Sequence, residues 1–201
     1  MKNSYICYHI VSHIIKLAGH IWYGGRVLGK ENIPKKGRVI LVGNHTSSLD
    51  AYMLYCGTNR PIHFLGKKEL FESKFGWFFK KMHLIPVDRN GNNDETKKLT
   101  LKLLNEEKVI GIFPEGTYHD NGSKTKKELL LPFKPGAISF AEKSGAPIIP
   151  FAIFGNWKFR GHPIIVFGKS IYVDKINNED KVKYLENIIK DMLIEINKTS
   201  K

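Results

Sequence analysis

The chain has 201 residues, of which 42% are hydrophobic, so it is long and apolar enough for one globular domain with a sizeable core. It carries 32 Lys and Arg against 19 Asp and Glu, a net charge of +13, which favours anionic partners such as nucleic acid, an anionic membrane surface or a phosphorylated substrate. Two cysteines, Cys7 and Cys56, are too few for a disulfide framework or a zinc cluster, and a reducing compartment is expected.

The N-terminal segment, residues 1–30, is apolar and aromatic but is interrupted by Lys16. Its uninterrupted stretch is shorter than the roughly 20 residues of a membrane-spanning helix, and no signal-peptide cleavage site follows it. Apolar residues recur at helical spacing: Ile6, Ile10, Ile14, Leu17 and Ile21. Aromatic residues typical of a lipid–water boundary accompany them: Tyr5, Tyr8, Trp22 and Tyr23. We predict an amphipathic, membrane-associating helix, with packing on the domain of residues 31–201 as the alternative.

From residue 38 onward, short apolar runs alternate with segments of helical pattern. The runs that predict strands are RVILVG, PIHFLG, HLIPV and VIGIF. The segments between them that predict helices are SLDAYMLYC, KELFESKFGWFFKKM and DETKKLTLKLLNEE. The third helix has an acidic start and carries Leu99 and Leu103.

The second half of the chain continues the alternation after a polar, turn-rich stretch, residues 118–130, which we expect to be a long exposed loop. GAISFAEKSG predicts a helix that ends at Gly145, and APIIPFAIF and PIIVFG predict strands. A C-terminal helix presents one apolar face: Val182, Leu185, Ile189, Met192 and Ile196. The pattern predicts an α/β fold, a mostly parallel central sheet flanked by helices.

The stretch GNHTSSLD, residues 43–50, places a histidine and an aspartate directly after a predicted strand. Thr46, Ser47 and Ser48 are good helix N-caps, which would put Asp50 in the first helical turn. In a continuous helix, His45 and Asp50 would lie on different faces, but a turn at His45 would let the carboxylate reach the imidazole and fix its tautomer. Taken alone, the spacing favours an acid that complements the helix dipole and an unrelated loop histidine.

Four further segments change this interpretation. After N-H-x-x-x-x-D come LIPVDR, GIFPEGT, LPFKPGA and APIIPFAI, in that order. A histidine and an aspartate five residues apart are common, but the ordered set of segments is specific. The set resembles the glycerolipid acyltransferase family, above all bacterial members that acylate 1-acyl-glycerol-3-phosphate to phosphatidic acid, over roughly residues 39–153. The resemblance implies an α/β acyltransferase.

The resemblance also implies that His45 is the general base and that Asp50 orients it. The chemistry agrees, because a thioester donor releases its thiolate readily and the acceptor hydroxyl needs only one base, worth about 10²- to 10⁴-fold. Neither a covalent intermediate nor a cofactor is required. Ser47 and Ser48 lack the G-x-S-x-G context of a serine nucleophile and are interpreted as capping residues.

Substrate-binding residues follow from the later segments of the same resemblance. Arg89 matches the basic residue that holds the acceptor phosphate, and a guanidinium suits that task. Glu115, Gly116 and Thr117 match the third segment, and Lys134 lies in the fourth. Glu115 could bind a glycerol hydroxyl, fix a neighbouring cation or stabilise the turn.

One position departs from the family pattern. Tyr118 stands where an arginine usually follows the threonine, so a phosphate ligand is missing there. The lysines that could compensate are Lys124, Lys126, Lys127 and Lys134. If no lysine takes the place of the missing arginine, the expected acceptor is a different lysolipid or glycerol-3-phosphate.

The segment of residues 64–82 mixes six aromatic residues with five lysines, a combination that fits a lipid-facing surface. Part of it is expected to wall a tunnel for the acyl chain. No carboxylate or cysteine stands directly beside His9 or His13 in the sequence, so no metal site is expected.

The expected partners are an anionic membrane surface, a lysophospholipid, and acyl-CoA or acyl carrier protein as donor. The expected location is the cytoplasmic face of the cell membrane, with peripheral or monotopic attachment. A nucleic-acid-binding module rests on charge alone, since the basic residues are scattered and no recognition motif is found. A lipid-ester hydrolase that uses the same histidine is a further alternative.

Overall fold

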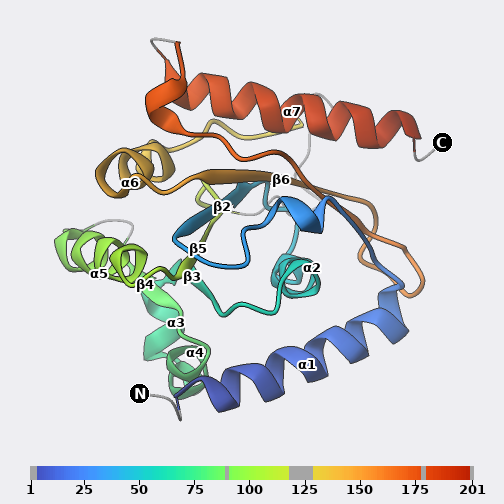
Figure 1. Cartoon of the computed structure of the whole chain (residues 1–201). Helices are drawn as coiled ribbons and strands as arrows, with labels where there is room; N and C mark the ends of the chain where they lie inside the picture. The colour runs from blue at the N-terminus through green and yellow to red at the C-terminus, as the bar shows by residue number, and fades with distance from the viewer. Residues whose placement is uncertain (1–3, 89–90, 118–128, 178–179, 200–201) are drawn as a thin grey trace.

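The computed structural model in Figure 1 describes residues 4–88, 91–117, 129–177 and 180–199. Within these residues, strands form one sheet in the order β1-β7-β6-β2-β5-β3-β4. Neighbouring strands are parallel except for β6 and β7. The strands are β1 (Arg26–Leu28), β2 (Val39–Gly43), β3 (Ile62–Lys67), β4 (Ile85–Val87), β5 (Val109–Ile112), β6 (Ile148–Phe154) and β7 (Ile164–Phe167). The predicted α/β fold with a mostly parallel sheet is confirmed.

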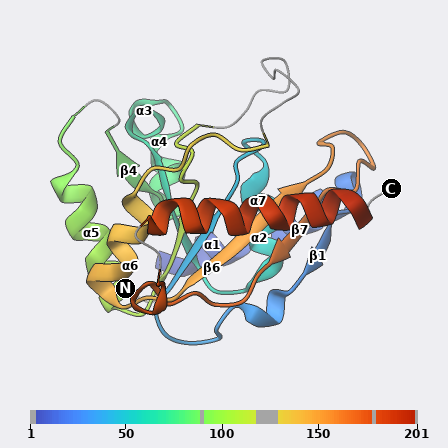
Figure 2. The same cartoon turned by 90° about the horizontal axis from the view of Figure 1, so that it is seen from above.

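Helices cover both faces of this sheet, because side chains alternate between the faces along each strand. In β2, Ile40 and Val42 face one core, and Val39 and Leu41 face the other. The first core lies under α5 (Asp94–Asn105), α6 (Gly136–Ser144) and α7 (Lys181–Thr199), and Figure 2 shows α7 running across the sheet. The second core lies under α2 (Asp50–Gly57) and α1 (Ser4–Tyr23). Two short 3-10 helices lie at Lys30–Asn32 and Val173–Lys175.

Helix α1 packs on α2 at the bottom of Figure 1, at the side opposite α7. The two helices approach closely at Gly19, where an added Cβ would lie 2.4 Å from the ring of Tyr52. The apolar stripe of α1 points away from the protein, with 55–65% of each side chain exposed: Ile6, Ile10, Ile14, Leu17 and Ile21. None of the helices within the described residues combines the length and hydropathy needed to cross a bilayer.

The prediction that Tyr8 lies at a lipid boundary is wrong. Its side chain is 2% exposed, and its hydroxyl accepts a hydrogen bond of 2.9 Å from the backbone N–H of Ile62 in β3. Tyr8 therefore fixes α1 to the sheet. A buried hydroxyl needs such a partner, because burying it without a hydrogen bond is costly.

The single helix predicted for residues 68–82 is also wrong, because the segment forms α3 (Lys68–Glu72) and α4 (Gly76–Lys81). The hydroxyl of Ser73 donates to the carbonyl of Leu70 at 2.7 Å and accepts from the N–H of Phe75 at 3.3 Å, so it replaces helical hydrogen bonds. At Gly76, an added Cβ would lie 2.1 Å from the carbonyl oxygen of Phe71. Glycine permits this close turn between the two helices.

Candidate active site

His45 lies just beyond the carboxyl end of β2, at the edge of the sheet where the parallel strand β5 also ends. Asn44, which is 3% exposed, holds this end of β2 against β6. Its Nδ2 donates to the carbonyl of Ile153 at 2.8 Å, and its Oδ1 accepts from the N–H of Ile153 at 2.7 Å. The paired hydrogen bonds fix the point at which the chain turns toward α2.

The structure brings the side chains of His45 and Asp50 together. Nδ1 of His45 lies 2.7 Å from Oδ2 of Asp50, whose side chain is fully buried. The same oxygen accepts the backbone N–H groups of Thr46 at 2.6 Å and Ser47 at 3.1 Å. Because an ionised carboxylate only accepts, Nδ1 of His45 carries the proton and donates it, which leaves Nε2 as the basic nitrogen.

The start of α2 differs from the predicted one. The helix begins at Asp50, its N-cap is Leu49, and no side chain caps it. The hydroxyl of Ser47 instead accepts from the N–H of Leu49 at 3.2 Å, within the turn. Since the carboxylate of Asp50 already accepts the N–H groups of the turn, the expected capping roles of Thr46, Ser47 and Ser48 do not arise.

The ring of His45 stacks on Phe113, with a centroid distance of 4.0 Å and an interplanar angle of 16°. The backbone N–H of His45 donates to Oε1 of Glu115 at 2.7 Å. The other oxygen of Glu115 accepts the N–H of Leu131 at 2.7 Å, and Glu115 is 5% exposed. Glu115 therefore links the turns that follow β2 and β5. These contacts match one of the three roles considered from the sequence, the stabilisation of the turn.

Gly116 and Lys134 also lie together at this site. Gly116 has a φ of +73°, and an added Cβ would lie 2.9 Å from Nζ of Lys134. The ammonium group of Lys134 thus lies over the backbone of the turn that follows β5, and it reaches this place without an obstructing side chain. Thr117 lies next to it on the wall of the same cavity.

Several residues considered from the sequence lie outside the described residues. Arg89, the expected phosphate ligand, is one of them, and so is Tyr118, the departure from the family pattern. The lysines that could compensate for it and lie outside are Lys124, Lys126 and Lys127. Their expected roles remain predictions.

Two cavities meet at His45. The larger cavity has a volume of about 840 Å³, and Gly116, Thr117 and Lys134 line it near His45. Its other walls are mainly apolar and include Tyr55, Phe64, Leu70, Phe78, Phe79 and Met82. The smaller cavity has a volume of about 540 Å³ and is lined by Arg26, Asn44, Glu115, Trp157 and His162. The larger cavity therefore combines the cation of Lys134 with a mainly apolar wall.

No group of three or more His, Cys, Asp or Glu side chains within the described ranges could hold a metal ion. Nδ1 of His13 lies 2.7 Å from the carbonyl oxygen of His9, so this nitrogen is engaged within α1.

Two residues at the site were not identified from the sequence as functional. Thr46 was interpreted as a helix cap, yet its hydroxyl donates to Oδ1 of Asp50 at 2.8 Å. Trp157 comes from the loop after β6, and its Nε1 donates to the hydroxyl of Thr46 at 3.0 Å. A separation of 111 residues carries no local pattern, so no sequence signal could have found this contact.

The sheet, the His45–Asp50 pair and the apolar cavity define an acyltransferase, and the comparisons with known proteins agree. A family model described as Acyltransferase matches residues 25–154, more than half of the chain. The chain belongs to this family and is an acyltransferase enzyme.

The names of similar proteins specify an acyltransferase activity more closely. The 1-acyl-sn-glycerol-3-phosphate acyltransferase of Bacillus subtilis is 35% identical over 151 residues, which cover 74% of this chain and 70% of that protein. The enzyme of the same name from Borreliella burgdorferi is 31% identical over 189 residues, covering 87% and 73%. The crystal structure of PlsC, the 1-acyl-sn-glycerophosphate acyltransferase of Thermotoga maritima, superimposes with a TM-score of 0.74 at 23% identity, covering 94% of this chain and 79% of that one. This last likeness shows the fold.

Proposed function

We propose that the enzyme transfers a fatty acyl group from a thioester donor, acyl-CoA or acyl carrier protein, to the sn-2 hydroxyl of 1-acyl-sn-glycerol-3-phosphate and so forms phosphatidic acid. The observation that carries the proposal is the 2.7 Å contact between His45 and the buried Asp50 beside a cavity that is apolar along most of its wall. The two bacterial relatives named above support the choice of acceptor.

His45 acts as the general base in this reaction. As the acceptor oxygen attacks the thioester carbonyl carbon, Nε2 takes the hydroxyl proton, and Asp50 stabilises the imidazolium that forms. The tetrahedral intermediate then collapses, the C–S bond breaks, and the thiolate leaves and recovers the proton from Nε2. Stacking on Phe113 and the donated hydrogen bond at Nδ1 hold the ring in place through both steps.

The phosphate of the acceptor binds at the polar end of the larger cavity. Lys134 supplies a positive charge over Gly116, and we assign Arg89 and Thr117 to the same task. Glu115 keeps the turn in place by accepting the N–H groups of His45 and Leu131. The acyl chain lies along the apolar wall formed with α3 and α4.

The alternative acceptors are another lysolipid and glycerol-3-phosphate, because Tyr118 replaces the arginine that the family usually has. This alternative keeps the same base and the same donor. It changes only the groups that surround the phosphate.

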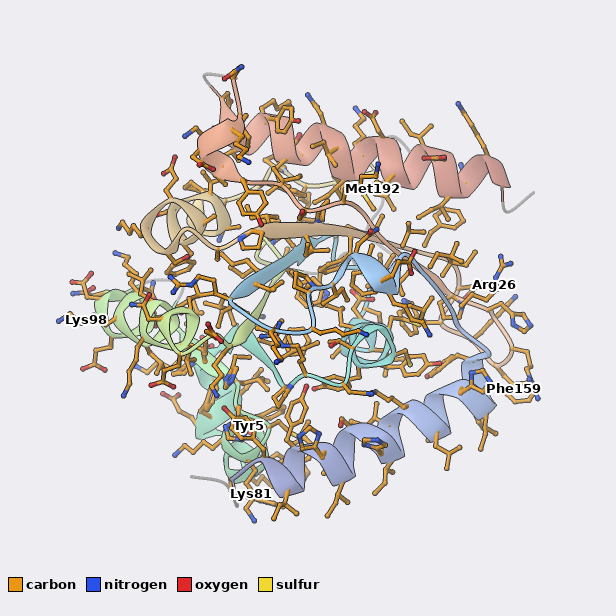
Figure 3. The ribbon with its side chains drawn as sticks, viewed as in Figure 1. Tyr5, Arg26, Lys81, Lys98, Phe159 and Met192 are labelled. Carbon is orange, nitrogen blue, oxygen red and sulfur yellow. The ribbon has the colours of Figure 1, made fainter. Side chains whose placement is uncertain are left out.

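We also propose that residues 1–30 attach the domain of residues 31–201 to the cytoplasmic face of the cell membrane, peripherally or monotopically. The exposed apolar stripe of α1 supports this, since a soluble helix would turn such residues inward. Trp22 packs on the exposed Phe159 at one end of the stripe, and α4, which contacts α1, exposes Trp77 and follows the exposed Phe75. Figure 3 shows Lys81 beside the start of α1 and Phe159 beside its end.

The proposal is tested with purified enzyme, both thioester donors and a panel of acceptors: 1-acyl-glycerol-3-phosphate, other lysophospholipids and glycerol-3-phosphate. Turnover is expected with 1-acyl-glycerol-3-phosphate, and His45→Ala should lower kcat at least about 100-fold because the base is lost. His20→Gln changes an exposed histidine of α1 and should retain the rate. Acylation of no acceptor, or an unchanged rate in His45→Ala, would overturn the proposal. Free fatty acid released without any acceptor would identify a hydrolase instead.

A further inference from the structure

A chain of hydrogen bonds leads from the loop after β6 to the buried carboxylate of Asp50. Nε1 of Trp157 donates to Oγ1 of Thr46 at 3.0 Å, and this hydroxyl donates to Oδ1 of Asp50 at 2.8 Å. The other carboxylate oxygen, Oδ2, faces Nδ1 of His45. The hydroxyl of Thr46 thus contacts the carboxylate oxygen that His45 does not, and Trp157 contacts this hydroxyl.

The direction of these hydrogen bonds is fixed by the groups themselves. An indole N–H can only donate, and an ionised carboxylate can only accept. The hydroxyl between them must accept from Trp157 and donate to Asp50, so its proton has one orientation. A threonine hydroxyl without such a partner would rotate among several orientations.

We infer that Trp157 and Thr46 are positioning residues for the acyl transfer, which hold Asp50 in the orientation that aligns His45. The inference rests on the proposed function, in which His45 is the base. The backbone nitrogen of Thr46 lies 2.6 Å from Oδ2 of Asp50. A rotation of the carboxylate would move Oδ2 away from this N–H group and from Nδ1 of His45. The hydroxyl on Oδ1 opposes that rotation and takes up part of the negative charge.

The position of Trp157 is in turn fixed by the end of α1. Its ring packs edge to face on Tyr23, with a centroid distance of 5.5 Å. The loop that carries it also donates two backbone hydrogen bonds to α1, from Arg160 to the carbonyl of Trp22 at 2.8 Å and from His162 to that of Tyr23 at 2.9 Å. The exposed end of α1 and the catalytic pair are therefore parts of one connected structure.

The charged and titratable groups around His45 come from several elements. Asp50 lies on α2, and Glu115 contacts the backbone of His45. The other charged or titratable groups that line the two cavities are Arg26, Tyr52, Tyr55, Lys67, Lys97, Lys134 and His162. The variants below leave all of them in place, so a change in the pH profile reports on the hydroxyl chain.

The first test compares Thr46→Val, which keeps the shape and loses the hydroxyl, with Thr46→Ser, which keeps the hydroxyl. Thr46→Val should lower kcat about 10-fold with KM within about two-fold, because alignment is lost and binding is not. Because the carboxylate that pairs with His45 is then changed, the acidic limb of kcat/KM against pH should shift from its wild-type position by roughly half a pH unit. Thr46→Ser should restore the wild-type kcat and the wild-type position of the acidic limb.

The second test removes only the indole N–H. Trp157→Phe keeps an aromatic ring beside Tyr23 and should shift kcat and the acidic limb in the same directions as Thr46→Val, by smaller amounts. Tyr184→Phe changes an exposed aromatic residue of α7 and should leave both unchanged. Thermal unfolding of every variant separates a positioning effect from a loss of folding, since a positioning effect lowers kcat while the midpoint stays within a few degrees.

The outcomes distinguish this inference from the proposed function. If His45→Ala keeps its rate, the proposed function fails. If His45→Ala is inactive while Thr46→Val and Trp157→Phe both keep wild-type kcat and the wild-type acidic limb, the positioning role alone is overturned.

Discussion

Asp50 shows at the scale of single residues how a buried carboxylate is stabilised by its hydrogen-bond partners. Its carboxylate is fully buried, yet it accepts hydrogen bonds from four groups: Nδ1 of His45, the N–H of Thr46, the N–H of Ser47 and the hydroxyl of Thr46. Burying a charge without partners would be prohibitively costly. The turn between β2 and α2 is therefore built around this anion, and its position at the start of α2 adds the favourable end of the helix dipole.

Replacing Asp50 by Asn tests this assignment with almost no change of shape. The amide lacks the negative charge that stabilises the imidazolium, and its NH2 group can turn toward His45 and favour the wrong tautomer. We expect kcat to fall by about 10²- to 10⁴-fold, measured in the acyl transfer assay at saturating donor. Asp94→Asn, at an exposed carboxylate that begins α5, is the matched control. A loss of less than about three-fold in Asp50→Asn would contradict the role of the charge.

The geometry of His45 and Asp50 could be predicted only in part from the sequence. The spacing of five between His45 and Asp50 was compatible with both facing and diverging side chains, and the family resemblance was needed to decide. The geometry depends on Asn44, which joins the end of β2 to Ile153 over 109 residues, and on Trp157. Such contacts depend on strand order, which no local pattern encodes.

At the scale of elements, α1 is joined to the sheet by a buried cluster at its start. Nδ1 of His63 lies 3.1 Å from the carbonyl oxygen of His83, so it carries the proton, and Nε2 accepts from the hydroxyl of Tyr5 at 3.3 Å. The ring of Tyr5 also packs on that of His83 at 4.3 Å. A neutral His63 therefore satisfies both partners, whereas a protonated ring could not accept from Tyr5.

The pH dependence of stability follows from this cluster. Burial, then the nearby His83 and Lys108, lower the pKa of His63 to about 4, below the usual value of 6.5. Between about pH 4 and pH 6.5, His63 is protonated in the unfolded chain and neutral in the folded chain. The free energy of unfolding therefore falls as the pH drops from about 6.5 to about 4, by up to about 3 kcal/mol, and this contribution levels off below.

His63→Asn removes the titrating ring and keeps a donor for the carbonyl of His83. Urea unfolding at pH 7.0 and pH 4.5 should show that the wild type loses about 2 kcal/mol more than the variant between the two pH values. His20→Asn changes an exposed histidine of α1 and should follow the wild type. Equal losses in His63→Asn and wild type would contradict the neutral, buried state of His63.

The elements themselves were largely predictable, because each has a local pattern. Buried strands such as β2 and β5 are apolar runs, and Gly145 ends α6 with a φ of +65° as expected. The division between α3 and α4 was not predictable from apolar spacing, since it depends on the hydroxyl of Ser73 and the close turn at Gly76. Strand β1 was missed because two of its three residues are exposed, so it is held by pairing with β7 and not by an apolar run.

At the scale of the whole molecule, the apolar and basic residues of one face form a surface suited to an anionic bilayer. Beside the stripe of α1 are two exposed aromatic residues, Trp77 on the contacting helix α4 and Phe159 against Trp22, each with a cation on its ring. Lys81 lies 5.4 Å from the ring of Trp77, and Arg160 lies 5.8 Å from that of Phe159. Apolar side chains would enter the acyl boundary while the cations meet lipid phosphates, each contributing about 1 kcal/mol near the surface.

Binding to vesicles tests this surface separately from catalysis. The wild type should float with vesicles of anionic phospholipid and bind much more weakly in about 1 M salt or to neutral vesicles, because salt screens the lysines and arginines. Ile14→Asp places a charge in the middle of the stripe and should weaken binding at least about ten-fold. Its thermal stability should not change, since Ile14 is already 61% exposed. Leu99→Asp makes the same kind of change at an exposed site on α5 and should bind like the wild type. If Ile14→Asp bound as tightly as Leu99→Asp, the stripe would not be the membrane contact, and attachment would have to come from another part of the positively charged surface.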